Sequence, residues 1–250
     1  FDDDEHSHEL LCLAKTNTGH KNLMKIISSA HNNYTYQSPI INFNDLIKLK
    51  DDIIVISGGK DSHVFELLKR NRPKDAEKRI DSFLKVFDDD FILEVQKTNR
   101  SDEFEYFSNI LPIATAKGIP LIATNDVLFA KPDDFDTHET KVCINTGKTL
   151  NDPNREKLFS QEQYFKSSDD MAELFKGFDS LLDNTNEISK KCNVSIHTKQ
   201  YFLPEYPVPE DHNFDSYLVD LSKKRLQDYI NNFNSEKNKI YTDRLDYELN

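Results

Sequence analysis

The fold is decided by IPLIATNDVL, residues 119–128. Its first five residues are apolar without polar alternation, which is typical of a strand buried on both faces of a parallel sheet. The apolar run stops at Thr124-Asn125-Asp126. Polar groups at the carboxyl end of such a strand lie where α/β folds usually assemble their sites. Asp126 is therefore the first candidate functional residue.

Strands and helices alternate along the chain before this stretch. Short apolar runs predict strands over 10–14, 53–57 and 91–96, and helical spacing of apolar residues predicts helices after each of them. These helices cover 22–30, 45–50, 62–70, 74–86 and 103–117, with Pro73 in a first turn and Gly118 as a C-cap. The alternation favours the α/β class, with a mainly parallel sheet and right-handed crossovers.

The character of the chain changes near residue 200. Three helices are predicted before it, over 133–147, 171–178 and 179–192. The run YFLPEYPVPE, residues 201–210, contains three prolines, which favours an extended connector. An amphipathic helix of about six turns follows over 213–233. We therefore expect a first domain over 1–200, a connector over 201–212 and a helical segment over 213–250.

Composition and charge restrict the function. The 250 residues are 37% hydrophobic and 30% charged, which is a globular composition. Lys and Arg number 32 against 44 Asp and Glu, so the formal net charge is −12. A free-standing protein of this acidity would repel phosphates, which disfavours a nucleic-acid binder. If the chain works on DNA, other domains must hold the DNA.

The cysteines and the chain ends point to a cytoplasmic segment of a longer polypeptide. Cys12, Cys143 and Cys192 are widely separated without CxxC spacing, which favours reduced thiols. No apolar run approaches the ~20 residues that cross a bilayer, and no signal peptide is recognised, so no membrane contact is expected. The chain begins with Phe1 rather than Met, and residues 241–250 resemble the start of an interrupted helix.

A metal-dependent hydrolase site is the most specific chemical hypothesis from the residues alone. Asp126 and Glu94 lie at or near the carboxyl ends of predicted parallel strands, and His138 and Glu139 follow nearby in sequence. Carboxylates and imidazoles together suit hard or borderline metals. The structural alternative is favoured because no HExxH spacing is present. In that alternative Asp126 caps the following turn, Glu94 pairs with a Lys or Arg, and His138 is a surface helix residue.

Three further motifs are more simply assigned to structure than to function. His6 and His8 form an HxH pair, but they lie among four acidic residues in a predicted loop over 1–8. The run 57–60, SGGK, follows a strand as a phosphate-binding turn would, yet it lacks GxxxxGK[ST] spacing, and a tight turn accounts for its glycines equally well. The basic run 223–225 is assigned to the solvent face of the last predicted helix.

Seven stretches taken together resemble a known family. The chain contains, in this order, LLCLAKTNTGHKNLMKIISSA, VISGGKDSHV, FILEVQKTNRSDE, GIPLIATNDVLFAKPDDFDTHE, TGKTLNDPNR, TNEISKKCNV and YFLPEYP. They resemble the amino-terminal PHP (polymerase and histidinol phosphatase) domain of the alpha subunit of bacterial DNA polymerase III. The resemblance covers nearly all of residues 8–210, and residues 213–250 look like the helical start of that subunit's polymerase module.

The resemblance implies a fold and an activity. The family's PHP domain is a distorted (βα)7 barrel with its metal site at the carboxyl ends of the strands, and this chain resembles one that lacks its first strands. The full-length family member is a DNA-directed DNA polymerase, a nucleotidyltransferase of chromosome replication for which Mg²⁺ is expected. Its palm aspartates would lie outside this chain, so the resemblance implies no catalytic residue here.

The family's metal-binding positions can be compared one by one. Members with a complete site have His where this chain has Glu9, Cys where it has Gly59, and Asp-x-His where it has Asp126 followed by Leu128. Asp126 alone would remain of these four ligands, which implies a vestigial site with no metal bound by this segment.

The resemblance to PHP domains without phosphoesterase activity implies a scaffold that docks the separate proofreading exonuclease, the epsilon subunit, among other subunits of the holoenzyme. Two alternatives from other classes stay open. One is an active metal-dependent PHP phosphoesterase or pyrophosphatase, and the other is a free-standing binding module.

Overall fold

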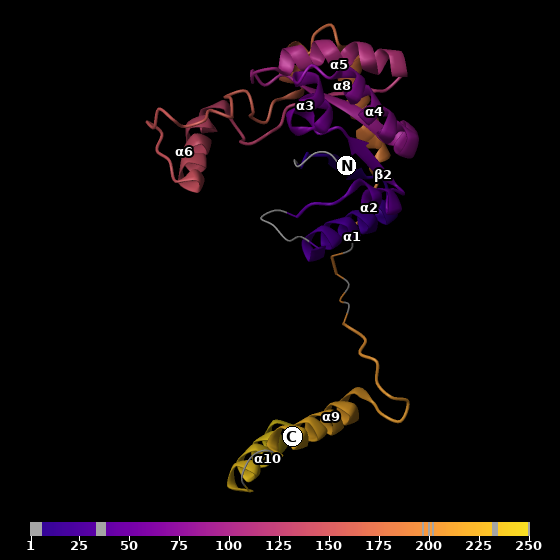
Figure 1. Cartoon of the computed structure of the whole chain (residues 1–250), viewed down its shortest axis with the longest axis vertical. Coiled ribbons are helices and arrows are strands. Elements are labelled where there is room, and N and C mark those ends of the chain that lie inside the picture. Colours follow the sequence, from indigo (N-terminus) through magenta and orange to yellow (C-terminus); the bar gives the residue numbers. More distant parts are fainter. Residues whose placement is uncertain are drawn as a thin grey trace. The chain divides into compact units, whose positions relative to one another are not determined.

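The chain divides into two compact units, Phe1–Ile196 (unit 1) and His197–Asn250 (unit 2). A computed structural model describes residues 7–33, 39–196, 198–199, 201, 203–231 and 235–249 (Figure 1). The predicted loop over 1–8 falls mostly outside these residues, and its described part, Ser7 and His8, has no regular structure. Whether the two units are a PHP barrel and a polymerase lead-in stays a prediction.

Unit 1 is built on a four-stranded sheet. Its strands are β1 (Leu11–Ala14), β2 (Ile53–Ile56), β3 (Phe91–Gln96) and β4 (Leu121–Thr124), and they lie side by side in chain order. β2, β3 and β4 run parallel, whereas β1 pairs antiparallel with β2. The predicted α/β class is confirmed. The described strands form an open sheet, so they do not by themselves make the seven-stranded barrel.

The helices of unit 1 occur where periodicity predicts them, with ends shifted by a few residues. Pro73 opens its helix, and Gly118, with a φ of 66°, ends another by donating to Ala114 O and Thr115 O. The first helix begins at Asn17, five residues before its predicted start at Asn22. Gly19 does not break this helix but lies inside it, where its backbone packs directly against Asp52 O. The helices are α1 (Asn17–Asn33), α2 (Phe43–Lys48), α3 (His63–Lys69), α4 (Pro73–Phe87), α5 (Glu103–Lys117), α6 (Phe135–Thr146), α7 (Ser168–Leu174) and α8 (Asp179–Lys191).

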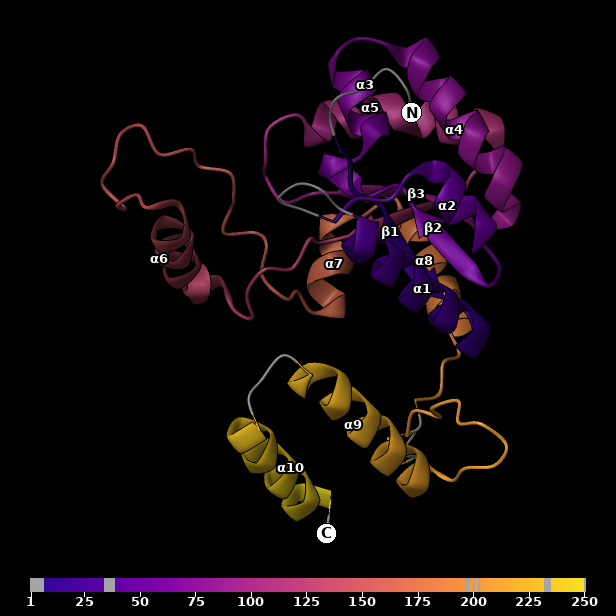
Figure 2. The ribbon, with the colours of Figure 1, turned by 60° about the horizontal axis from the view of Figure 1, so that its bottom comes forward.

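The two faces of the sheet are both buried, which accounts for the unbroken apolar runs in its strands. One face belongs to the main core, in which strand residues such as Val55 and Leu93 join Phe65, Phe83 and Ile110 from α3, α4 and α5. These three helices lie together in both views (Figures 1 and 2). The other face forms a smaller core, which contains Ile54, Ile56, Ile92, Ile122 and Ile188.

Strand β4 is held in the sheet on both of its edges. β3 pairs with one edge, and two side chains of α8 bond to backbone carbonyls of β4. Asn184 donates to Leu121 O at 2.8 Å, and Thr185 donates to Ala123 O at 3.3 Å. Helix α8 thereby satisfies carbonyls that an open sheet edge would leave unpaired.

Between β4 and α7 the chain leaves the sheet and returns. We call residues 127–166 the arm. It contains the 3₁₀ turn η3 (Pro132–Asp134) and α6, and in both views α6 stands apart from the sheet (Figures 1 and 2). At the base of the arm the outgoing and returning stretches pair, with Phe165 N donating to Phe129 O at 3.0 Å.

Unit 2 contains two helices, α9 (Phe214–Ile230) and α10 (Ser235–Leu249). Asn213 caps α9 by accepting a hydrogen bond from Ser216 N. His212 lies between the carboxylates of Asp211 and Asp220, at 3.0 and 3.1 Å, and hydrogen bonds to these carboxylates raise its pKa. The basic run 223–225 is exposed, as predicted. Among the described residues, no helix combines the length and apolarity that a membrane span requires.

Candidate functional site: a polar network at the carboxyl edge of the sheet

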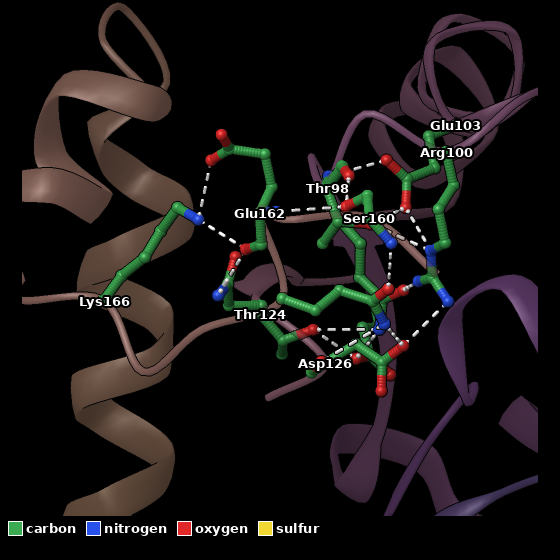
Figure 3. A network of polar contacts seen from close by, with 12 residues as sticks. Thr98, Arg100, Glu103, Thr124, Asp126, Ser160, Glu162 and Lys166 are labelled. Carbon is green, nitrogen blue, oxygen red and sulfur yellow. Dashed lines mark hydrogen bonds and ion pairs between the residues drawn. The ribbon is translucent and has the colours of Figure 1, made fainter. Parts of the chain in front are cut away.

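Arg100 is the centre of a buried polar network beyond the carboxyl end of β3. Its side chain is 7% exposed and uses all three of its nitrogens. Nη1 lies 2.7 Å from Asp126 Oδ2, Nη2 donates to Gln96 Oε1 at 2.6 Å, and Nε lies 3.1 Å from Glu103 Oε1 (Figure 3). One guanidinium thus joins the end of β3, the start of α5 and the loop after β4.

Glu103 provides the second carboxylate of the network. It begins α5, and its side chain is 7% exposed. Its Oε2 accepts from Thr98 N and its Oε1 accepts from the Thr98 hydroxyl, both at 2.6 Å. Arg100 therefore lies between two carboxylates, and backbone and hydroxyl donors satisfy the oxygens of Glu103. Such saturation is what allows buried ionised groups to be tolerated.

Asp126 has a strained backbone and two side-chain partners. Its φ is 44°, in the left-handed region that non-glycine residues seldom adopt. Besides its ion pair with Arg100, its Oδ2 accepts a hydrogen bond from Gln163 Nε2 at 2.8 Å. Gln163 is fully buried and belongs to the arm. The expectation that Asp126 merely caps the following turn is wrong, because its carboxylate bridges Arg100 and the arm.

Glu94 joins the same network through Gln96. It is 5% exposed, and its Oε1 accepts from Gln96 Nε2 at 3.0 Å and from the Thr124 hydroxyl. The expectation that Glu94 pairs with a Lys or Arg is wrong, because its side-chain donors among the described residues are an amide and a hydroxyl. Gln96 then connects Glu94 to Arg100. Glu94 and Asp126 therefore lie in one network at the strand ends, as their positions in the sequence predict.

His138 and Glu139 lie elsewhere, on α6 in the arm. The His138 ring is half-buried between Phe129 and Phe159, with ring centroids 5.5 and 4.8 Å away. Glu139 is 5% exposed and pairs with Arg155, and this hydrogen bond raises the Arg155 pKa. The four residues of the metal-site hypothesis therefore do not come together in the described structure. His138 and Glu139 are close to Asp126 in sequence but not in space, because the chain leaves the sheet after Asp126.

Of the three positions at which the family resemblance implies lost ligands, Gly59 and Leu128 contact residues of the network. Gly59 follows β2 with a φ of 55°, and a Cβ there would lie 2.6 Å from Gln96 Nε2. Leu128 is 40% exposed, and its amide donates to Gln163 O at 2.9 Å. Glu9 is exposed, and its carbonyl lies against Gly58. Both glycines have positive φ in a tight turn, which agrees with the structural assignment of the SGGK run.

The remaining candidates are separate from this network. His8 lies 3.3 Å from Glu66 and stacks on His63 at 4.5 Å, while its predicted partner His6 lies outside the described residues. The three cysteines are free thiols, and burial raises the pKa of Cys12 to about 11, so this thiol stays protonated at neutral pH. Within the described parts of the chain, no group of three or more His, Cys, Asp or Glu is arranged to hold a metal.

Sequence reasoning missed Arg100, Gln96 and Gln163. A signal for Arg100 exists in QKTNRSDE, residues 96–103, which connects a buried strand to a helix at the same edge of the sheet as Asp126. A cation in such a loop is a natural partner for the neighbouring carboxylate. No local pattern identifies Gln163, which reaches Asp126 from 37 residues away.

Comparisons with known proteins give the relationship. Residues 1–98 match the family model of the PHP domain. The chain is 38% identical over 253 residues to the DNA polymerase III subunit alpha of Escherichia coli (strain K12), an alignment covering 98% of the chain and 22% of that protein. The chain is thus similar to about a fifth of the length of DNA polymerase III alpha subunits, and its first 98 residues match the PHP domain.

Two other relatives give the same result. The subunit alpha of Pseudomonas aeruginosa is 35% identical over 248 residues, and that of Vibrio cholerae is 34% identical over 248 residues. Each alignment covers 96% of the chain and 21% of the relative. The resemblance seen in the seven sequence stretches is confirmed, and the chain spans about a fifth of the length of the relatives it matches.

Proposed function

We propose that this chain is the PHP region of the alpha subunit of a bacterial DNA polymerase III. The complete polypeptide would be a cytoplasmic nucleotidyltransferase that extends a primer on a DNA template, with Mg²⁺ held by palm aspartates outside this chain. Similarity over 96–98% of the chain supports the assignment. The net charge of −12 fits a region that leaves DNA contact to other domains.

In this proposal the sheet is part of a distorted (βα)7 barrel. Three parallel strands with a polar site at their carboxyl edge suit that fold. β1 is an edge strand of the described sheet, so further strands of the polypeptide would pair beside it.

We further propose that the former metal site is inactive and serves the scaffold. The observation that carries this proposal is the ion pair between Arg100 and Asp126. A metal cluster needs several anionic or imidazole donors, but here the remaining carboxylate already has a fixed cation beside it. Gly59 offers no donor, and Leu128 presents a hydrocarbon. These residues do not fit a metal cluster, so no reaction step is assigned to one.

Metal analysis separates this proposal from the phosphoesterase alternative. We expect substoichiometric zinc and manganese in the purified protein, and no phosphoester hydrolysis. Restoring the donors with Glu9→His, Gly59→Cys and Leu128→His should still not produce a metal site. Arg100 remains beside Asp126 in that variant and occupies the carboxylate that a metal would need.

The matched variant adds Arg100→Ser to these three changes and should bind more zinc than the triple variant. Elemental analysis after dialysis measures both. Stoichiometric metal in the unaltered protein, together with a phosphoesterase activity that Asp126→Ala abolishes, would establish the alternative.

Docking of the proofreading exonuclease is the proposed role of the scaffold. In this proposal the region has no reaction of its own and contributes by holding partners and neighbouring domains in place. We expect the complete polypeptide to co-elute with the epsilon subunit in size-exclusion chromatography, and a polypeptide lacking this region to elute separately. Primer extension by the complete polypeptide is the control. Extension without co-elution refutes the docking role and leaves the polymerase assignment intact.

A further inference from the structure

The arm, residues 127–166, has little apolar core of its own. The structure describes every residue of the arm, and Cys143 is the one buried apolar side chain among them. Around α6 the arm holds a small aromatic cluster, in which the Phe129 ring lies 5.9 Å from Phe135 and 5.5 Å from His138. The buried pair of Glu139 and Arg155 completes the interior. So small a core leaves much of the arm's apolar surface uncovered.

Large apolar side chains are exposed on the arm more densely than elsewhere in unit 1. Ile144 is 76% exposed and Phe165 is 74% exposed. The arm's set is Val127, Leu128, Ile144, Leu150, Leu158 and Phe165, whereas the rest of the described unit has Leu11, Met24, Ile27, Ile40, Phe104 and Ile196. Half of the exposed large apolar side chains in the described part of unit 1 thus lie in the 40 residues of the arm. Single exposed apolar residues are ordinary, but such a concentration marks an interaction surface.

The polar network fixes the base of this arm to the sheet. Gln163 bonds to Asp126, and the hydroxyl of Ser160 donates to Thr98 O (Figure 3). Asn125 Nδ2 donates to Tyr164 O at 2.6 Å, which ties the loop after β4 to the returning stretch. These bonds hold the returning stretch of the arm at the edge where Arg100 and Asp126 pair. The residual ligand position therefore orients the arm.

We propose that the arm is an interface for another part of the same polypeptide, and that the network around Asp126 sets its direction. This inference rests on the proposed function, in which the chain belongs to a longer subunit. The matched relatives are about five times as long as the aligned segment. In the proposed longer subunit, the remainder of the polypeptide provides the part that covers the arm. Permanent interfaces are more apolar than those between subunits that exchange, so exposed Ile144 and Phe165 favour the same polypeptide over a separate exonuclease.

Cysteine labelling of the complete polypeptide tests the proposal. Ile144→Cys and Phe165→Cys report on the arm, and Phe104→Cys is the control, because Phe104 is 82% exposed on α5. Peptide mass spectrometry after maleimide treatment reads each site separately from the native thiols. We expect labelling at 144 and 165 to be slower than at 104 by about tenfold or more, without any other protein present. Adding Asp126→Ala should raise the labelling rates at positions 144 and 165 and leave the labelling rate at position 104 unchanged.

Three results would overturn the inference. Equal labelling at all three positions means that the arm is uncovered in the complete polypeptide. Protection that needs added exonuclease assigns the arm to that partner instead. If Asp126→Ala leaves the labelling rates at positions 144 and 165 unchanged, the network does not orient the arm. Primer extension by the same preparation is measured alongside, because its loss would count against the proposed function rather than against this interface.

Discussion

Replacing Arg100 with alanine is expected to lower the free energy of unfolding of the chain by about 3–5 kcal/mol. The change removes a cation that is 7% exposed and leaves Glu103, also 7% exposed, as a buried carboxylate without this counter-ion. Asp126 loses its ion pair at the same time. Breaking a buried pair by removing one partner costs far more than the pair contributes net, because the desolvation penalty of the remaining charge persists. Urea unfolding measures the loss.

Two variants show whether the effect belongs to the network. Arg100→Lys keeps the charge but loses the planar group that reaches three acceptors at once. Its free energy of unfolding should therefore lie between those of the original protein and of Arg100→Ala. Arg72→Ala is the surface control, because Arg72 is 53% exposed and pairs with Asp75 three residues along the chain. Arg72→Ala should lower the free energy of unfolding by less than about 1 kcal/mol. If Arg72→Ala is as costly as Arg100→Ala, burial of the network is not what stabilises this edge of the sheet.

The fold was largely predictable because its strands are apolar on both faces. In a chain with helical segments between them, runs such as 53–57 and 119–123 are typical of buried parallel strands. The direction of β1 was not predictable, since a short apolar run has the same periodicity in a parallel and in an antiparallel pair. The start of α1 was misplaced because Gly19 suggested a break, whereas a close approach to Asp52 O requires the glycine inside the helix.

The candidate site was predictable only in part. Strand ends correctly located Asp126 and Glu94, because adjacent parallel strands finish at the same edge. Their partners come from loops, which carry no periodicity, so Arg100 and Gln163 were missed. The metal-site hypothesis that included His138 and Glu139 rested on their short separation in sequence from Asp126, and both residues lie on α6, away from the network.

The surroundings of Asp126 decide its role. A carboxylate at the end of a buried strand suggests a metal ligand when its surroundings are unknown. Here an arginine provides the positive charge, and a fully buried glutamine from the arm provides a donor. At this strand end the carboxylate joins the sheet to the arm through Arg100 and Gln163.

Replacing Glu139 with alanine should open the arm while the sheet stays folded. Arg155, whose side chain is 10% exposed, would lose the carboxylate that it pairs with, and an unpaired charge in this position destabilises the arm. Since the arm has few other buried contacts, we expect this destabilisation to appear as local unfolding of α6. Hydrogen exchange of the α6 amides should then accelerate by about two to three powers of ten, with little change in β4.

A double replacement separates the charge from the packing. Glu139→Leu with Arg155→Met removes both charges and keeps apolar volume, so exchange in α6 should return close to its original rate. Asp136→Ala is the control on the same helix, because Asp136 is exposed in the first turn and affects mainly the helix dipole, worth about 0.3–1 kcal/mol. Recovery in the double variant would show that the uncompensated charge, not the loss of a contact, opens the arm. A double variant as open as Glu139→Ala would show that the pair itself is what holds α6 in place.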